Sequence, residues 1–165
     1  MEKKFIFKEF AGLFVFIILL FGIWFSATTI LQTSSPLFVV SSGSMIPALE
    51  IGDIIVVSGK DKFNELKNED IIVFNLPTDY KRVIVHRVEE IKTESEQIQI
   101  KTKGDNNPYV DGWTVIESNY IGKVITKVPY VGNVTIWVSP PVNYYLIFTI
   151  LLIMLTNEVK QKKQQ

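Results

Sequence analysis

An uncharged apolar run near the N-terminus limits what this chain can fold into more than any other feature. Residues 10–31 (FAGLFVFIILLFGIWFSATTIL) are 22 consecutive residues without a charge. As an α-helix with a rise of 1.5 Å per residue, they would extend over roughly 33 Å, enough to cross the hydrocarbon core of a bilayer. The run exceeds the apolar core of a cleaved signal peptide, about 7–15 residues, and Ser26-Ala27-Thr28 is a poor cleavage site. We therefore expect an uncleaved transmembrane helix over residues 10–31.

A second apolar run occupies residues 142–156, directly after Pro140-Pro141. Its 15 residues are short for a full span, but the tyrosines at its start suit a membrane interface. A short helix can also be accommodated by local thinning of the bilayer. We expect a second transmembrane helix here, and the alternative is a buried or interfacial C-terminal helix.

Lysines flank the two apolar runs on their outer sides. Because cytoplasmic segments of membrane proteins are enriched in Lys and Arg, these lysines predict cytoplasmic termini, residues 1–9 and 157–165. Residues 32–141 would then form one extracytoplasmic domain on the outer face of the cell (plasma) membrane. The flanking residues are Lys3, Lys4 and Lys8 before the first run, and Lys160, Lys162 and Lys163 after the second.

The overall charge balance excludes some partners and chemistries. Lys and Arg together number 17, and so do Asp and Glu, which leaves a formal net charge of zero. Nucleic acid is therefore not expected as a partner, because binding phosphates requires an excess of basic side chains. Without any cysteine, the chain has no disulfides, thiol nucleophile or cysteine-based metal site.

The segment between the apolar runs has the pattern of a β domain. Short stretches rich in Val and Ile alternate with Gly, Asp, Asn and Pro turn signals, as in small antiparallel domains. We predict a mainly β fold, with Greek-key or barrel-like closure and a short helical turn within residues 60–68. The predicted strands are Leu37–Ser41, Asp53–Ser58, Asp70–Asn75, Arg82–Ile91, Gln97–Lys103 and Tyr120–Lys127.

Ser44 is the candidate nucleophile, in a Ser-Gly-Ser-Met-Ile-Pro turn shortly after the first apolar run. Gly43 would let the backbone approach a substrate closely, and Pro47 would stiffen the exit from the turn. A serine hydroxyl needs a base to accept its proton. Because such runs are also ordinary loops, the turn gains weight only from the residues that follow.

His86 is the only histidine and lies within an apolar strand. Imidazole is the usual base for serine. Lys81 is the alternative, since a desolvated lysine can also activate serine. The two positions are five residues apart, so a regular strand would point them to opposite faces. Only one of them can face Ser44.

Asp105 and Asp111 are candidates for the carboxylate that would orient the histidine. Both lie in the turn-rich stretch that begins at Gly104, where Asp and Asn also serve simply to build turns. The stretch lacks the ligand ladder and terminal Glu of a calcium loop, so no metal site is expected.

Together these segments resemble the signal peptidase I family, in its archaeal and endoplasmic-reticulum branch, peptidase family S26B. That branch carries histidine where most bacterial members carry lysine. Although Tyr80-Lys81-Arg82 is similar to the bacterial lysine motif, Val85-His86-Arg87 follows in place of its Gly-Leu-Pro-Gly-Asp continuation. The segments that carry the resemblance are Ser42–Pro47, Gly52–Val57, Val83–Val88, and Lys103–Asn107 with Asp111.

The resemblance implies a signal-peptidase/LexA-like β fold and an endopeptidase that removes signal peptides from exported preproteins without a cofactor. Ser44 would be the nucleophile and His86 the base, with Asp111 orienting His86; Asp105 would do so instead or support the loop. The oxyanion hole would consist of the Ser44 backbone N–H and the Ser42 hydroxyl. Implied partners are signal peptides, the lipid bilayer, and a translocon or accessory subunits. The residues expected to line the substrate pockets are Val39, Val40 and Val85.

Two other functions fit parts of the sequence. A non-catalytic, membrane-anchored β module would explain the apolar runs and the strands, but not the order of Ser44, His86 and the two aspartates. A serine protease that uses Lys81 as its base would cut some other membrane substrate. The two are separated from a serine–histidine peptidase by whether Ser44, His86 or Lys81 is needed for cleavage.

Overall fold

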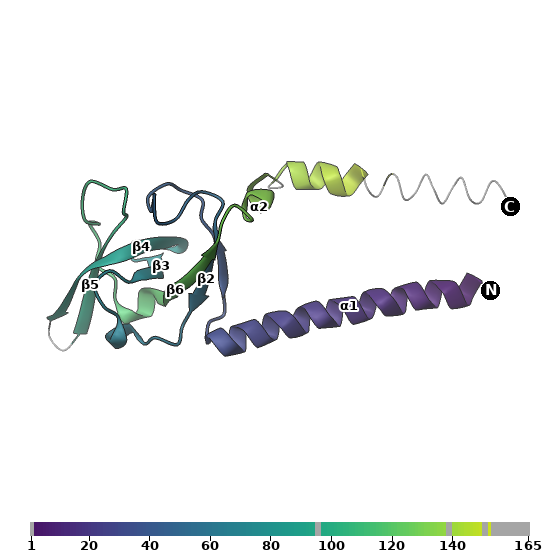
Figure 1. Cartoon of the computed structure of the whole chain (residues 1–165), viewed down its shortest axis with the longest axis horizontal. Coiled ribbons are helices and arrows are strands. Elements are labelled where there is room, and N and C mark those ends of the chain that lie inside the picture. The colour runs from purple at the N-terminus through teal and green to yellow at the C-terminus, as the bar shows by residue number, and fades with distance from the viewer. Residues whose placement is uncertain (1, 95–96, 138–139, 150–151, 153–165) are drawn as a thin grey trace.

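The computed structural model combines one long N-terminal helix with a six-stranded antiparallel sheet (Figure 1). It describes residues 2–94, 97–137, 140–149 and 152. The predicted β domain and the N-terminal apolar helix are therefore confirmed. The elements are α1 (Glu2–Leu31), β1 (Leu37–Val39), β2 (Ile54–Ser58), η1 (Phe63–Glu65), β3 (Ile71–Leu76), β4 (Asp79–Glu94), β5 (Gln97–Lys103), η2 (Glu117–Asn119), β6 (Tyr120–Val128) and α2 (Asn133–Trp137).

Helix α1 extends away from the sheet (Figure 1), and most of its side chains from Phe14 onward are exposed. Its segment Phe14–Leu31 is long and apolar enough to cross a membrane. Phe21 and Phe25 are 72% and 73% exposed, a costly arrangement in water but a favourable one in lipid. The end of the helix is tied to the sheet, because the Gly59 N–H donates to the Leu31 carbonyl at 2.8 Å.

The expected second span is not shown. Residues 142–149 are helical, but the remainder of the 142–156 run falls largely outside the described part of the chain. Within the described ranges, Phe14–Leu31 is the one helix that meets the length and composition of a span.

The strand order is β1-β2-β6-β3-β4-β5, and every pairing between neighbours is antiparallel. The last strand, β6, therefore inserts between β2 and β3 and brings the two halves of the domain into one sheet. No pairing between the edge strands β1 and β5 is present among the described residues, so the predicted barrel-like closure is not completed by backbone hydrogen bonds.

Strand β4 is longer than predicted and pairs with two neighbours in turn. Its first half pairs with β3, where Ile72 lies opposite His86, and its second half pairs with β5 from Arg87 onward. Charged residues occupy both ends of β4 and break the apolar alternation there, which is why the sequence pattern indicated only its middle. The change of partner takes place next to His86.

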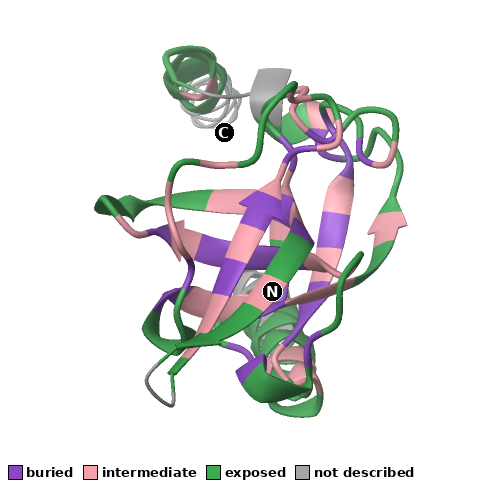
Figure 2. Cartoon of the chain, turned by 90° about the vertical axis from the view of Figure 1, so that its left-hand side faces the viewer, coloured by how far each residue is buried: buried purple, intermediate pink, exposed green. Residues whose placement is uncertain are grey.

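Two apolar clusters stabilise the two faces of the curled sheet, and the buried bands alternate along the strands (Figure 2). Ile72 and Phe74 of β3 belong to one cluster, whereas Val73 between them belongs to the other. This is the alternation of side chains that a strand buried on both faces requires. The second cluster also contains Met45, which is fully buried and fixes the turn that carries Ser44.

Candidate active site

Ser44 lies in a turn that is held on both sides by the core. Val40, at the end of β1, exchanges backbone hydrogen bonds with Gly52 and Asp53, both at 2.9 Å. After the turn, Met45 enters the second apolar cluster and its carbonyl accepts a hydrogen bond from the Leu49 N–H at 2.8 Å. The half-buried Ser44 is therefore presented by a short loop whose two ends are anchored.

His86 lies on β4 with its imidazole ring between Ser44 and Asp111. Its Nε2 atom is 3.2 Å from the Ser44 hydroxyl oxygen, and its Nδ1 atom is 2.6 Å from Asp111 Oδ2. The side chains of His86 and Asp111 are 7% and 5% exposed. Because a carboxylate only accepts hydrogen bonds, this arrangement places the ring proton on Nδ1 and leaves the Nε2 lone pair for the Ser44 O–H.

Asp111 is held by strand β5 as well as by the histidine. The Thr102 hydroxyl donates to Asp111 Oδ2 at 2.7 Å, and the Asp111 N–H donates to the Thr102 carbonyl at 2.9 Å. Thr102 is fully buried. Its two hydrogen bonds fix both the backbone and the carboxylate of Asp111 relative to β4.

Asp105 lies elsewhere and pairs with Arg87. The guanidinium donates to Asp105 from Nε at 2.8 Å and from Nη2 at 2.6 Å, and from Nη1 to the Glu69 carbonyl at 2.8 Å. The hydrogen bonds to Asp105 raise the pKa of the Arg87 guanidinium. Of the two aspartates, the structure thus places Asp111 at His86 and Asp105 on the neighbouring side chain, which points to the other face of the strand.

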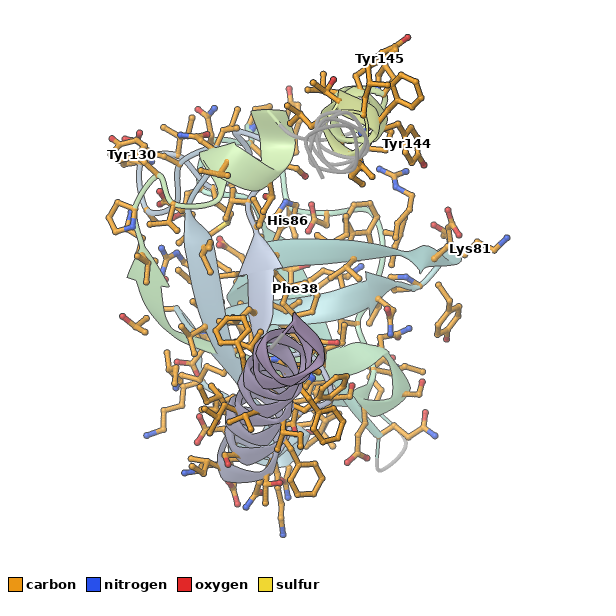
Figure 3. All side chains as sticks on the ribbon, turned by 90° about the vertical axis from the view of Figure 1, so that its right-hand side faces the viewer. Phe38, Lys81, His86, Tyr130, Tyr144 and Tyr145 are labelled. Atoms are coloured by element: carbon orange, nitrogen blue, oxygen red, sulfur yellow. The ribbon has the colours of Figure 1, made fainter. Side chains whose placement is uncertain are left out.

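Lys81 lies far from Ser44. It occupies the exposed end of the β3–β4 hairpin, well apart from His86 (Figure 3). Five residues of extended strand separate their backbones by roughly 16 Å. The histidine is therefore the basic side chain that contacts Ser44.

A cleft of about 400 Å³ opens beside Ser44 and His86. Its lining includes Val39, Val40 and Val85, so all three residues predicted to form the substrate pockets border it. The Ser42 hydroxyl also faces the cleft, 3.4 Å from the Ser44 hydroxyl.

Two further residues near His86 were missed by the sequence analysis. On β5, Thr102 follows Ile98 and Ile100 on the same, inward-facing side of the strand. A polar residue at such a position was the feature of the sequence that could have indicated a role for Thr102. Trp113 stacks on the imidazole, with ring centroids 6.4 Å apart and an angle of 18° between the planes, a spacing typical of interacting aromatic rings. Nothing in the sequence pattern distinguished Trp113 from a core aromatic.

No metal site is found in the part of the chain that the structure describes. The described His, Cys, Asp and Glu side chains form no group of three or more that could hold a metal ion.

A serine hydroxyl, an imidazole and a carboxylate in contact are the arrangement of a serine hydrolase, and comparisons with known proteins agree with this class. The family model described as "Signal peptidase, peptidase S26" matches residues 8–130. The signal peptidase complex catalytic subunit SEC11 of Fusarium vanettenii is 34% identical over 126 residues, which cover 72% of this chain and 73% of the relative.

Two other relatives carry the same description and cover more of the chain. The SEC11 subunit of Eremothecium gossypii is 33% identical over 153 residues, covering 87% of this chain and 88% of its own. That of Candida albicans is 35% identical over 134 residues, covering 75% and 78%. The chain therefore belongs to the signal peptidase family, peptidase S26, which confirms the family and the branch that the sequence segments predicted.

Proposed function

We propose that this chain is a membrane-bound serine endopeptidase that removes N-terminal signal peptides from exported preproteins, with Ser44 as nucleophile and His86 as general base. The observation that carries the proposal is the continuous contact from Ser44 through His86 to Asp111, at 3.2 Å and 2.6 Å. Membership of the signal peptidase family supports the choice of substrate.

The contacts from Ser44 through His86 to Asp111 support a two-step mechanism of proton transfer. The Ser44 oxygen attacks the carbonyl carbon at the cleavage site while its proton passes to His86 Nε2. Asp111 holds the Nδ1–H and stabilises the positive charge that forms on the ring. His86 then gives the proton to the departing amine, which leaves an acyl group on Ser44. Water, deprotonated by His86, releases the cleaved signal peptide and regenerates the enzyme.

The negative charge that develops on the substrate oxygen needs hydrogen-bond donors. The Ser44 backbone N–H is the first candidate, because it accompanies the attacking atom. The Ser42 hydroxyl is the second, since Ser42 lines the same cleft and its hydroxyl lies 3.4 Å from that of Ser44. Loss of one such donor costs about 10²–10³ in turnover.

Two free strand edges border the cleft and support binding of the substrate as an added strand. Within the described residues, β1 pairs only with β2, and β4 begins to pair with β5 only at Arg87, so residues 83–86 have one unpaired edge. An extended peptide could hydrogen-bond to either edge. Val39, Val40 and Val85 would then contact the small side chains that precede the cut.

We further propose that the chain crosses the membrane twice. Residues 10–31 would form a transmembrane helix and 142–156 a second one, with residues 32–141 as the extracytoplasmic catalytic domain. Residues 1–9 and 157–165 would be cytoplasmic. The apolar, exposed α1 supports attachment to a membrane, while none of the comparisons favours the plasma membrane over another membrane.

The relatives are described as catalytic subunits of a signal peptidase complex, which supports accessory subunits or a translocon as partners of this chain, in addition to lipid and signal peptides. The zero net charge gives no reason to expect nucleic acid.

Cleavage of a preprotein by the purified, detergent-solubilised chain tests the proposal. Ser44→Ala and His86→Ala should each lower kcat by about a thousandfold or more, and Asp111→Asn should lower kcat far more than it changes KM. Lys81→Ala is the matched control and should cleave normally. Cleavage by Ser44→Ala, or loss of cleavage in Lys81→Ala but not in His86→Ala, would contradict the proposal. A wild-type chain that cleaves nothing would point either to a missing partner subunit or to the non-catalytic binding module.

A further inference from the structure

The loop after β5 is hydrogen-bonded directly to the turn that carries Ser44. The Asn106 side-chain Nδ2 donates to the Gly43 carbonyl at 3.1 Å, and the Asn106 backbone N–H donates to the Ser44 carbonyl at 2.8 Å. Because the first partner is a carbonyl oxygen, only the amide nitrogen of Asn106 can make that bond. One residue thus holds two consecutive carbonyls of the nucleophile turn.

Gly104 allows this close approach. A Cβ atom at Gly104 would lie 2.7 Å from the Ser44 carbonyl oxygen, so any larger residue would separate the two loops. The loop is itself closed by a hydrogen bond from the Asn107 N–H to the Gly104 carbonyl at 2.9 Å. Asn106 is therefore presented to Ser44 from a rigid turn.

The Gly43 carbonyl and the Ser44 N–H belong to one planar peptide group and point in opposite directions. Fixing the direction of this carbonyl therefore fixes the direction of the N–H. The Gly43 carbonyl also accepts a hydrogen bond from the Ile46 N–H at 3.3 Å. Among the described residues, none accepts a hydrogen bond from the Ser44 N–H. That N–H is thus left available to a ligand in the cleft.

We propose that Asn106 is a positioning residue for the oxyanion hole: by donating to the Gly43 carbonyl, its side chain directs the Ser44 N–H toward the oxyanion of the transition state. This inference rests on the proposed function. A donor that is oriented in advance stabilises developing charge without reorganising during the reaction. This hydrogen bond stabilises the transition state more than the bound substrate, because the carbonyl oxygen of the substrate is still uncharged.

Removing the Nδ2 donor should therefore lower kcat and leave KM unchanged. We expect Asn106→Ala to lower kcat about three- to tenfold, the effect of losing one hydrogen bond. Asn106→Asp should lower it at least as much, since a carboxylate at the same position cannot donate. The melting temperature should stay at the wild-type value, because buried Met45 still anchors the turn.

A peptide aldehyde that forms a tetrahedral adduct with Ser44 gives a second readout. Its affinity should fall by the same factor as kcat, whereas the KM for the preprotein, whose scissile carbonyl is uncharged, should not change. A role limited to structure would weaken both together or lower the melting temperature. Asn107→Ala is the matched control, as it removes a neighbouring amide that is not bonded to the Gly43–Ser44 turn, and should retain wild-type kcat.

Measuring the wild type and Ser44→Ala in the same assay separates a failure of the proposed function from a failure of the role proposed for Asn106. If Ser44→Ala cleaves as well as the wild type does, the proposed function fails and this inference fails with it. If both behave as expected but Asn106→Asp keeps wild-type kcat, or raises KM with kcat unchanged, Asn106 does not position the oxyanion hole and the proposed function stands.

Discussion

At the scale of single residues, Thr102 shows how much the candidate site depends on a side chain that does not touch Ser44. Its hydroxyl donates to the same carboxylate oxygen that accepts from His86. Two donors in different directions fix the orientation of the Asp111 carboxylate, and through it the plane of the imidazole. A buried acceptor that loses one of two donors is left partly unsatisfied.

We expect Thr102→Val to lower kcat about tenfold with little change in KM, because the carboxylate then holds His86 in a less defined orientation. Thr102→Ser keeps the hydroxyl and should retain most of the activity. Steady-state kinetics with a short soluble peptide measures both. Equal kinetics for the valine and serine variants would show that the hydroxyl does not contribute.

The same scale shows what the sequence could predict about the site. Ser44 and His86 were identified from their residue types and order, because each has a distinctive chemistry. The residues alone leave Asp105 and Asp111 as alternatives, because both lie in one turn-rich stretch, and only the family resemblance favours Asp111. Their partners are settled by three-dimensional details, the position of Arg87 on the opposite strand face and the bond from Thr102, which no local pattern encodes.

At the scale of elements, a buried carboxylate ties the loop after Ser44 to strand β6. Asp53 is 1% exposed and accepts hydrogen bonds from the Glu50 N–H at 3.0 Å and the Tyr130 N–H at 3.2 Å. Lys127 Nζ lies 3.1 Å from Asp53 Oδ2 and donates to the Ala48 carbonyl at 2.8 Å. Burial alone would raise the pKa of the Asp53 carboxyl, but these donors together lower it.

This pKa shift predicts a loss of stability in acid. A carboxyl whose pKa is lower in the folded state stabilises the fold above its unfolded value, and that contribution is lost as the pH falls through the folded value. Between about pH 5 and pH 3, the melting temperature of the wild type should therefore fall more steeply than that of Asp53→Asn. Glu94→Gln, at an exposed position on β4, is the control and should follow the wild type. Parallel curves for wild type and Asp53→Asn would contradict this account.

The strands themselves were largely predictable, and their arrangement was not. All six predicted strands are present within a few residues of their expected ends, because alternation of Val and Ile with polar residues is a local signal. The insertion of β6 between β2 and β3 and the change of partner along β4 depend on contacts between distant segments. Those contacts leave no trace in the local pattern of any one strand.

At the scale of the whole molecule, the apolar helix and the catalytic sheet are joined closely. Helix α1 ends at Leu31, whose carbonyl accepts a hydrogen bond from Gly59 at the end of β2. A Cβ atom at Gly59 would lie 2.3 Å from the Gln32 carbonyl oxygen, so the helix end and the sheet are in direct backbone contact. Ser44 follows only 13 residues after Leu31, which would hold the candidate nucleophile near the membrane surface.

Deleting residues 2–31 tests whether this attachment contributes to activity. A preprotein embedded in the same membrane is presented to an anchored enzyme at a high effective concentration, whereas a short soluble peptide is not. Cleavage of a vesicle-embedded preprotein should therefore fall about ten- to hundredfold, with little change for the peptide. Replacing residues 2–31 with an unrelated apolar helix of equal length should restore cleavage if anchoring is the whole contribution. An equal loss on both substrates would instead mean that α1 stabilises the catalytic sheet through its contact with Gly59.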